Sequence, residues 1–425
     1  MKKILFSIIL TSITLFAQQQ NNRPAIMPII PFETNVISFP DSEDDYSVYY
    51  TYKIPYRLMI FERSVDSFNA EFRIQVEIKD KEDKLVARDI KDNKLTVNSF
   101  EETNDPKLIL QDYIGFNLKP GDYKVSAVIS DRNSSGERPL KPIDISLKQT
   151  DGAELLDPIV VRTRNKECDG KESFVLANSG GKIPFSNEEY GLIIPIADTS
   201  ITELEFTMEN NGEVIASGQL NNSILNRFDL AKCDDSLILA EFTDNLLTRN
   251  FLIPYVNEKI DEGVLELKIM KEEIDFEETI ILNVVWFNKP ISLYNSEKAI
   301  ELLTYIESED IVDSLLNEDE DDYPKVLQNY WAKFDPTPKT TFNEIMFEYY
   351  SRADYSIREF SSITNNNGAN SDRGMVYIKF GKPDKVDRKS NSQGEVIEIW
   401  TYSSAQRTFS FIDKIGTGNF TLIEN

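Results

Sequence analysis

The sequence predicts a multidomain protein in which two all-β sandwich domains precede an α+β domain. Up to about residue 290, apolar side chains alternate with polar ones in short runs, the pattern of half-buried strands. Turn-forming residues separate these runs at regular intervals, as in a β-sandwich. After Pro290 the apolar residues recur at helical spacing instead. The length of 425 residues suits two to four domains, and a hydrophobic content of 40% is enough for packed cores.

Residues 1–17 have the features of a secretory signal peptide. Lys2 and Lys3 precede an apolar and hydroxyl-bearing stretch that ends at Ala17. The stretch is short for a membrane span, so we expect cleavage after Ala17, although Leu15 is not the ideal residue near the cut. A buried N-terminal strand is the alternative. Residues 18–31 are polar and rich in proline, which predicts a tether or an edge segment. We expect the mature protein to be exported, to the periplasm or the extracellular side of the cell surface, without an integral membrane segment.

Residues 32–150 predict the first sandwich. In EFRIQVEIKD, every second residue from Phe72 to Ile78 is apolar, as in an antiparallel strand with one buried face. Further along, Pro120-Gly121 predicts a turn into a strand with Val125 and Ala127 on one face. This hairpin resembles the penultimate hairpin of many immunoglobulin-like extracellular modules, a resemblance of fold alone. It implies an immunoglobulin-like sandwich.

Residues 151–292 predict a second sandwich of the same kind. Seven strand candidates follow one another at regular spacing. They are DPIVVRTR, YGLIIPI, ELEFTM, EVIASGQL, SLILAEF, VLELKIM and ETIILNVVWF.

Residues 293–425 predict a helical connector followed by a small antiparallel sheet. Ser296 is expected to cap a first helix, Ser308 to begin a second, and YPKVLQNYWAKF to form a third. Thr341 is expected to open a long helix that ends near Phe360. The strands expected after it are MVYIKF, VIEIWTYSS, RTFSFID and NFTLIE.

The same region resembles a known family. YWAKFDPTPKTTFNE, EYYSR, DRGMVYIKFGKPD and EIW occur in this order, and they are similar to the GWxTD domain of exported bacterial proteins, seen especially in Bacteroidetes. The resemblance covers about residues 295 to 420. Gly368 and Asp372 match the signature, whereas Ala369 stands where the family has Trp and Ser371 where it has Thr. The resemblance implies export and a sandwich-plus-GWxTD layout, an altered contact at Ala369, and no defined biochemical activity.

Asp372, Arg373 and Gly374 are the candidate binding residues, expected where a loop meets a strand. Arg373 offers a planar fork of donors that suits a carboxylate of a ligand or partner. The same three residues also suit a structural turn, in which Asp372 accepts backbone hydrogen bonds and Arg373 pairs with an internal acid. The sequence favours the structural interpretation and leaves the binding one open.

Other acidic residues give weaker signals. The run NEDEDD, from Asn317 to Asp322, has oxygen ligands suited to calcium, but it lacks the spacing and glycine of an EF-hand and favours a solvated loop. A glycosidase needs two carboxyl groups at a fixed separation, which a sequence does not determine. The candidates are Asp335, Glu344, Glu348, Asp384, Glu395 and Glu398. Trp331 and Trp400 lie in predicted regular elements and favour core positions over a sugar platform.

Cys168 and Cys233 are the two cysteines of the chain. After export both would face an oxidising compartment, so a disulfide between them is a candidate. Such a bond would stabilise the fold by about 4 kcal/mol in the chain-entropy treatment. Two free thiols are the alternative. Neither cysteine lies in a CxxC motif, which disfavours a redox catalyst.

Charge and composition exclude several functions. A net charge of −26 argues against nucleic acid as a partner, and the absence of histidine excludes Ser-His-Asp catalysis and histidine-containing zinc sites. The charge is concentrated in residues 151–290 (−15) and 291–330 (−9), whereas residues 331–425 are neutral. We expect no metal and no cofactor.

The sequence therefore favours a non-enzymatic scaffold or protein-binding component of the bacterial envelope, whose partner is another envelope or surface protein. A carbohydrate- or peptide-binding module is the alternative. A hydrolase acting on an envelope polymer comes third.

Overall fold

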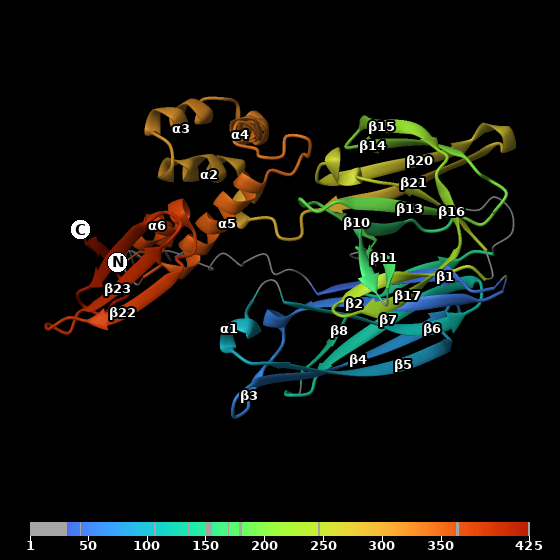
Figure 1. Ribbon diagram of the computed structural model, residues 1–425, viewed down its shortest axis with the longest axis horizontal. Coiled ribbons are helices and arrows are strands. Elements are labelled where there is room, and N and C mark those ends of the chain that lie inside the picture. The colour runs from blue at the N-terminus through green and yellow to red at the C-terminus, as the bar shows by residue number, and fades with distance from the viewer. Residues whose placement is uncertain are drawn as a thin grey trace, which may run out of the picture.

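The computed structural model describes residues 32–423 apart from 43, 106–107, 135, 150–154, 169, 178–180, 245–246 and 363–364. The predicted signal peptide and tether, residues 1–31, lie outside the described residues. The described chain forms two β-rich units and a C-terminal part made of helices and a small antiparallel sheet (Figure 1). None of the described helices is both long and apolar enough to cross a membrane.

The first unit consists of two sheets that face each other across one core. A three-stranded sheet has the order β1-β2-β6, and a larger sheet has the order β3-β4-β7-β8, with β5 paired to β4 and β9 to β7. Alternate residues of β4, from Phe72 to Ile78, are buried between the sheets, as their spacing predicts. The elements are β1 (Glu33–Pro40), β2 (Tyr46–Pro55), η1 (Tyr56–Leu58), β3 (Glu62–Arg63), β4 (Phe68–Asp80), β5 (Leu85–Val97), α1 (Phe100–Thr103), β6 (Ile109–Leu118), β7 (Gly121–Asp131), β8 (Glu137–Pro139) and β9 (Ile143–Leu147).

The second unit also consists of two sheets around a shared core. A seven-stranded sheet has the order β16-β19-β13-β10-β11-β18-β17, and a five-stranded sheet has the order β12-β21-β20-β14-β15. All seven predicted strands are present. The elements are β10 (Ile159–Cys168), β11 (Lys171–Leu176), β12 (Lys182–Pro184), β13 (Tyr190–Ile196), β14 (Leu204–Asn210), β15 (Glu213–Leu220), β16 (Ser223–Leu225), β17 (Arg227–Cys233), β18 (Ser236–Phe242), β19 (Arg249–Ile253), η2 (Val256–Glu258), β20 (Gly263–Lys271), η3 (Glu272–Ile274) and β21 (Phe276–Val285).

The two units are stacked against each other, so that four sheets lie in layers (Figure 1). The three-stranded sheet packs one face on its own unit and the other on the seven-stranded sheet, and β2 accordingly has buried residues on both faces. We call the second contact the layer interface. Its buried members are Ile37, Phe39, Ile159, Val161, Leu176, Ile193, Phe228, Leu230, Leu237 and Leu239.

Polar contacts fix the layer interface at its margins. The Tyr49 hydroxyl donates to Asp229, and Arg227 lies 2.7 Å from Asp41. Burial, with the nearby Asp229 carboxylate, raises the pKa of Tyr49. Hydrogen bonds of this kind resist sliding of one sheet over the other, because sliding would leave buried polar groups unpaired.

The C-terminal part contains the predicted connector and sheet, with corrections at the helix starts. Asn295, not Ser296, caps α2 by accepting a hydrogen bond from the Lys298 amide at 2.9 Å. Asn343, not Thr341, caps α5 by the same contact with Met346. The elements are η4 (Ile291–Tyr294), α2 (Ser296–Glu301), η5 (Leu302–Tyr305), α3 (Glu309–Leu316), η6 (Glu320–Asp322), α4 (Tyr323–Ala332), α5 (Glu344–Glu359), η7 (Gly368–Asn370), α6 (Asp372–Phe380), β22 (Lys385–Ser390), β23 (Val396–Tyr402), β24 (Arg407–Asp413) and β25 (Thr421–Ile423).

The segment MVYIKF was predicted to be a strand, and this prediction is wrong. It lies in helix α6, and β22, which the sequence did not indicate, is the edge strand of the sheet β22-β23-β24-β25. Val376 and Ile378 alternate with less buried residues and so imitate a strand. The helix forms because Ser371 caps it, its hydroxyl accepting a hydrogen bond from the Gly374 amide at 3.1 Å.

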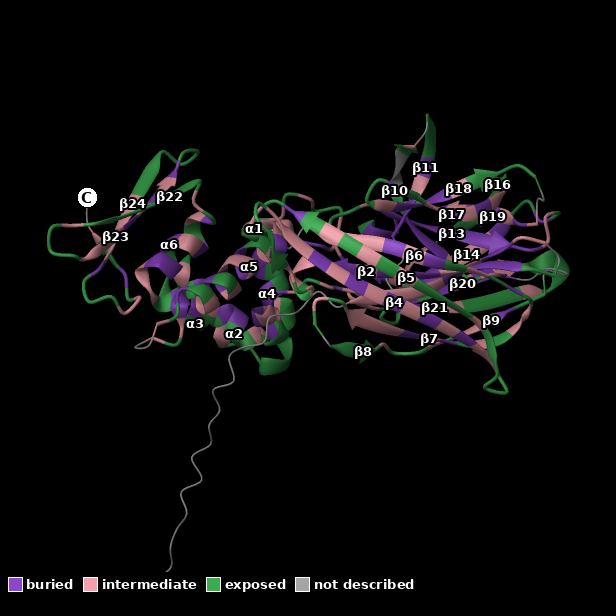
Figure 2. Ribbon diagram, turned by 90° about the horizontal axis from the view of Figure 1, so that it is seen from below, coloured by how far each residue is buried: buried purple, intermediate pink, exposed green. Residues whose placement is uncertain are grey.

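Aromatic side chains join the C-terminal part to the second unit. The rings of Phe185, Trp286 and Phe342 lie 5.2–5.3 Å apart, and Phe342 belongs to the core of the second unit. The C-terminal sheet itself projects away from the β units at one end of the molecule (Figure 2). The second unit and the C-terminal part are therefore joined by buried side-chain contacts near the start of α5, in addition to the covalent link of the backbone.

Replacing Leu239 by Ala tests the layer interface. Leu239 is fully buried there, so we expect the free energy of unfolding in urea to fall by about 3 kcal/mol through lost burial and a cavity. Leu225→Ala, at an exposed position, is the matched control and should change it little. Equal effects of the two substitutions would contradict a tightly packed interface.

Candidate functional site

The signature loop, residues 368–372, joins α5 to α6 and is held by internal hydrogen bonds. The Ser371 hydroxyl donates to the Gly368 carbonyl at 2.6 Å while it caps α6. The Asp372 carboxylate accepts a hydrogen bond from the Leu422 amide at 2.6 Å, which fixes β25 beside the helix. Ser371 in place of the family's Thr retains the capping hydroxyl.

Two glycines allow the backbones around this loop to touch. A Cβ atom at Gly368 would lie 2.2 Å from the Ser356 carbonyl oxygen, and one at Gly374 would lie 2.0 Å from the Gly368 carbonyl oxygen. Neither distance is possible for real atoms, so any side chain at these positions would push α5, η7 and α6 apart. The glycine of the signature and Gly374 of the predicted triplet both serve this close approach.

Ala369 lies in the interior of the domain. It is fully buried, in a cluster that includes Tyr349, Tyr350, Ala353 and Ile378. The position where the family has Trp is therefore a core position in this chain. At this position Ala369 packs against residues of α5 and α6.

Arg373 is also an interior residue. It is only 9% exposed, and its guanidinium stacks on Phe420 at 4.0 Å and on Phe360 at 5.1 Å. It donates to the Gly418 carbonyl at 3.1 Å and lies 3.5 Å from the Glu398 carboxylate. Burial lowers the pKa of Arg373, which Glu398 opposes. These contacts are the internal ones that a structural role requires.

Glu398 and Asp413 lie beneath Arg373 and are both buried. Glu398 accepts hydrogen bonds from Trp400 at 2.7 Å and from Arg388 at 2.6 Å. Asp413 accepts backbone hydrogen bonds from residues 415–418. Burial by itself would raise the pKa of Asp413, but these four amides outweigh it and the pKa is lowered.

The other candidate carboxylates are engaged in local contacts. Asp335 accepts from the Thr337 amide, Glu344 from Asn187, Glu348 from Arg352, Asp384 from the Ser403 amide and Glu395 from Asn391. The acidic run at 317–322 precedes α4, and its last three residues form the turn η6. Within the described part of the chain, no three His, Cys, Asp or Glu side chains come together in a way that would hold a metal ion.

Trp331 and Trp400 are core residues, each 3% exposed. Trp331 packs on Tyr330, Tyr349 and Tyr350, and Trp400 packs on Phe411. Neither ring is presented as a platform for a sugar.

Cys168 and Cys233 form a disulfide in the structure, with Cα atoms 6.3 Å apart. Cys168 ends β10 and Cys233 ends β17, and each lies beside a tight turn of its hairpin. The bond therefore joins two hairpin ends at one side of the seven-stranded sheet.

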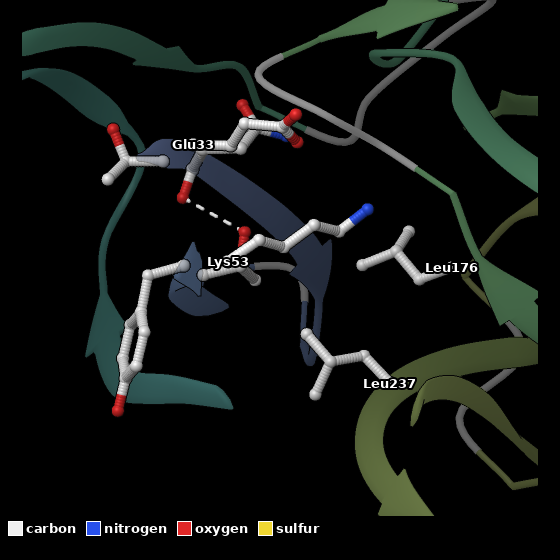
Figure 3. Close-up of a pocket in the computed structure, with 8 residues that line it drawn as sticks. Glu33, Lys53, Leu176 and Leu237 are labelled. Atoms are coloured by element: carbon white, nitrogen blue, oxygen red, sulfur yellow. Dashed lines mark hydrogen bonds between the residues drawn. The ribbon is translucent and has the colours of Figure 1, made fainter. Parts of the chain in front are cut away.

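A small cavity at the margin of the layer interface is lined by the partly buried Lys53. Glu33 lies opposite it on β1, and Leu176 and Leu237 line the side of the second unit (Figure 3). Burial lowers the pKa of Lys53. The cavity measures about 10 Å³, which is roughly the space of one water molecule. It is too small to admit a substrate.

Residues 271–422 match the family model described as the GWxTD domain. The chain thus contains a GWxTD domain. No curated protein matches the chain. The match begins at Lys271, the last residue of β20, so the GWxTD segment includes β21 and Trp286 of the second unit. It is thus longer than the resemblance at residues 295 to 420 indicated.

The second unit also has a groove outside residues 271–422. It is a groove of about 370 Å³ beside β15, lined by β14, β15, β19 and residues 254–259. We call it the β15 groove. Sequence patterns did not indicate the groove, because its walls come from segments that are distant in the chain. The one available signal was weak: the small residues Ala216 and Gly218 lie within a predicted strand.

Replacing Arg373 by Ala tests its role in the GWxTD domain. The change leaves Glu398 buried with one cationic partner fewer, so we expect a loss of about 3 kcal/mol in the free energy of unfolding. Urea denaturation of the full chain measures it, with Lys379→Ala on the exposed side of α6 as the control. An unchanged stability would favour the ligand clamp instead.

Restoring the family's Trp by Ala369→Trp should not restore a function in this chain. Because Ala369 is fully buried, the indole would overpack the core, and we expect a loss of about 3 kcal/mol in thermal unfolding experiments. Ala405→Trp, in the exposed turn between β23 and β24, is the matched control. A stable Ala369→Trp protein would mean that the helices move apart easily.

Proposed function

We propose that this protein is an exported, non-enzymatic scaffold of the bacterial envelope that binds another envelope or surface protein. The observation that carries this proposal is the burial of the sheet β1-β2-β6 on both faces. A protein whose parts are packed by buried interfaces holds its ends at a fixed separation, which is the property that a scaffold needs. The predicted signal peptide supports export.

The finer fold assignment is part of this proposal. We infer that both β units are sandwich modules of the immunoglobulin-like kind, which are common in exported proteins. The pairs of facing sheets and the alternating buried positions support this. The disulfide at the hairpin ends suits an oxidising compartment such as the periplasm or the cell surface.

We also propose that the protein has no catalytic activity of its own. The carboxylates that sequence reasoning offered for hydrolysis are engaged in caps, turns and ion pairs. A general acid needs a carboxyl group that is free to reach substrate. These contacts favour structural roles for the six acids.

A binding module for carbohydrate or peptide is the second candidate. The β15 groove favours it, because the groove combines an apolar floor with amide side chains and a partly exposed tyrosine on its margin. Grooves of this composition bind ligands by shape and a few polar contacts.

The test uses the full chain, tagged at its C-terminus and produced in the bacterium that encodes it. We expect the protein in the envelope fraction, and we expect protein crosslinkers applied to intact cells to join it to one protein in a reproducible ratio. The chain without residues 1–17 is the control and should remain in the cytosol, without this crosslink.

Three results would contradict the proposal. The full chain could remain in the cytosol like the control, it could crosslink to no protein, or the purified chain could hydrolyse envelope polymers at a rate that a boiled sample lacks. Each result would remove a different element of the proposal: export, protein binding or the absence of catalysis.

A further inference from the structure

The β15 groove opens at one edge of the second unit, where its two sheets separate. Met208 of β14 and Leu220, Ile253 and Val256 around it form a floor that belongs to the core of the unit. The floor of the groove is therefore formed by residues of the hydrophobic core, which an occupant can contact through the open side. A groove of about 370 Å³ is within the range of ligand sites in proteins.

Small residues of β15 lie over the wall of the groove. Ala216 lines the groove opposite Met208, and Gly218 lies opposite Phe206, which also lines it. A Cβ atom at Gly218 would lie 3.4 Å from the Phe206 ring, which is an ordinary contact. Larger side chains at these two positions would therefore cover Phe206 and Met208 and narrow the groove.

β15 is also an open edge. It is the last strand of its sheet, and among the described residues no strand pairs with its outer side. Exposed edges usually carry charges or proline, which prevent another strand from pairing. The edge strand β22 carries Lys385, Arg388 and Lys389, but β15 has neither Lys, Arg nor Pro.

Tyr255 on the margin of the groove has a strained backbone. Its φ is 54°, in the left-handed region that a bulky residue rarely adopts, and its side chain is 47% exposed. Strained positions of this kind cluster at functional sites. Tyr255 lines the groove, and its exposed ring is available to an occupant.

The charge around the groove is negative. The hairpin of β14 and β15 contains Glu205, Glu209 and Glu213 and no basic residue. On the margin, Glu258 and Lys259 offset each other. An occupant with Lys or Arg beside its apolar residues would therefore be attracted, and an acidic one repelled.

We propose that the β15 groove binds an extended peptide segment of a partner protein, which adds a strand to β15. Alternate apolar side chains of the segment would enter the groove over Phe206 and Met208, and Lys or Arg would flank them. This rests on the proposed role in protein binding and names the site and the chemistry of the partner. An unpaired edge provides backbone hydrogen bonds, and the hollow beside it selects side chains at every second position.

The open edge distinguishes a peptide from a glycan as the occupant. Tyr255 and the amide side chains on the margin could contact a sugar, but a sugar would leave the unpaired backbone of β15 unused, and the floor is apolar core surface. An added strand would use both the unpaired edge and the apolar groove. Its backbone would pair with β15, and its side chains would contact the floor of the groove.

The experiment uses the purified full chain and a displayed library of random twelve-residue peptides. We expect enriched peptides with apolar residues at alternate positions, Lys or Arg near the ends and no proline in the middle. The best peptide is then synthesised with a fluorescent label, and its Kd is measured by anisotropy.

Gly218→Val is the decisive variant. Valine fills the groove from an ordinary strand position and should weaken peptide binding at least tenfold while leaving the melting temperature nearly unchanged. Ser217→Val is the matched control, because it adds the same side chain to the opposite face of β15 and should leave binding unchanged. Tyr255→Asn should weaken binding without loss of stability, since Asn tolerates the left-handed backbone.

Strand addition has its own test. N-methylation of the peptide backbone at single positions removes one hydrogen-bond donor at a time. Because only every second amide of an added strand faces β15, methylation should weaken binding at alternate positions and be tolerated between them. Hydrogen exchange of β15 amides should slow when the peptide is bound.

Several results would overturn the proposal. These are enrichment of no peptide, binding that Gly218→Val does not weaken, a methylation pattern without alternation, a glycan that binds the groove instead, or a second copy of the chain that occupies it. If the protein crosslinks to an envelope partner but no peptide binds, the groove proposal fails and the scaffold proposal stands. If the chain binds the peptide but remains in the cytosol, the scaffold proposal fails and the groove proposal stands.

Discussion

The burial of one small sheet on both faces determines the architecture of this protein. The strands β1, β2 and β6 supply one face to the core of the first unit and the other to the layer interface. A sheet covered on both sides needs apolar residues on both, and β2 has them, which explains its nearly continuous burial. The two β units are therefore parts of one stacked body. The position of the C-terminal helices depends in turn on this body, because Phe342 packs on Phe185 and Trp286 of the second unit.

The signature of the GWxTD domain describes a structural joint in this chain. Its glycine permits backbone contact, its hydroxyl residue caps α6, and its aspartate holds β25. Arg373, directly after the signature, covers two buried acids between aromatic rings. These contacts are internal to the domain, and they account for the signature residues by packing. The partner surface that we propose therefore lies elsewhere, at the open edge of the second unit.

Local patterns predicted strands well and predicted contacts between them poorly. The alternation in β4 and the seven strands of the second unit could be read directly, because each depends on neighbouring residues. The segment Met375–Phe380 could not, since its alternation fits a strand while a cap at Ser371 makes it a helix. β13 was predicted as a strand, but the sequence did not indicate that it is buried along its whole length or which layer covers it. The β15 groove could not be predicted either, because β19 and the residues after it form one wall and are distant in sequence from the hairpin of β14 and β15.

The start of the family match at Lys271 has a consequence for where this protein can be divided. The matched segment carries β21, whose neighbours in the sheet are β20 and β12, and it carries Trp286, whose ring packs against Phe185. Cut out at Lys271, the segment would carry an unpaired strand and an uncovered indole. The physical unit of folding is therefore longer than the matched segment, because it includes the sheet that covers β21.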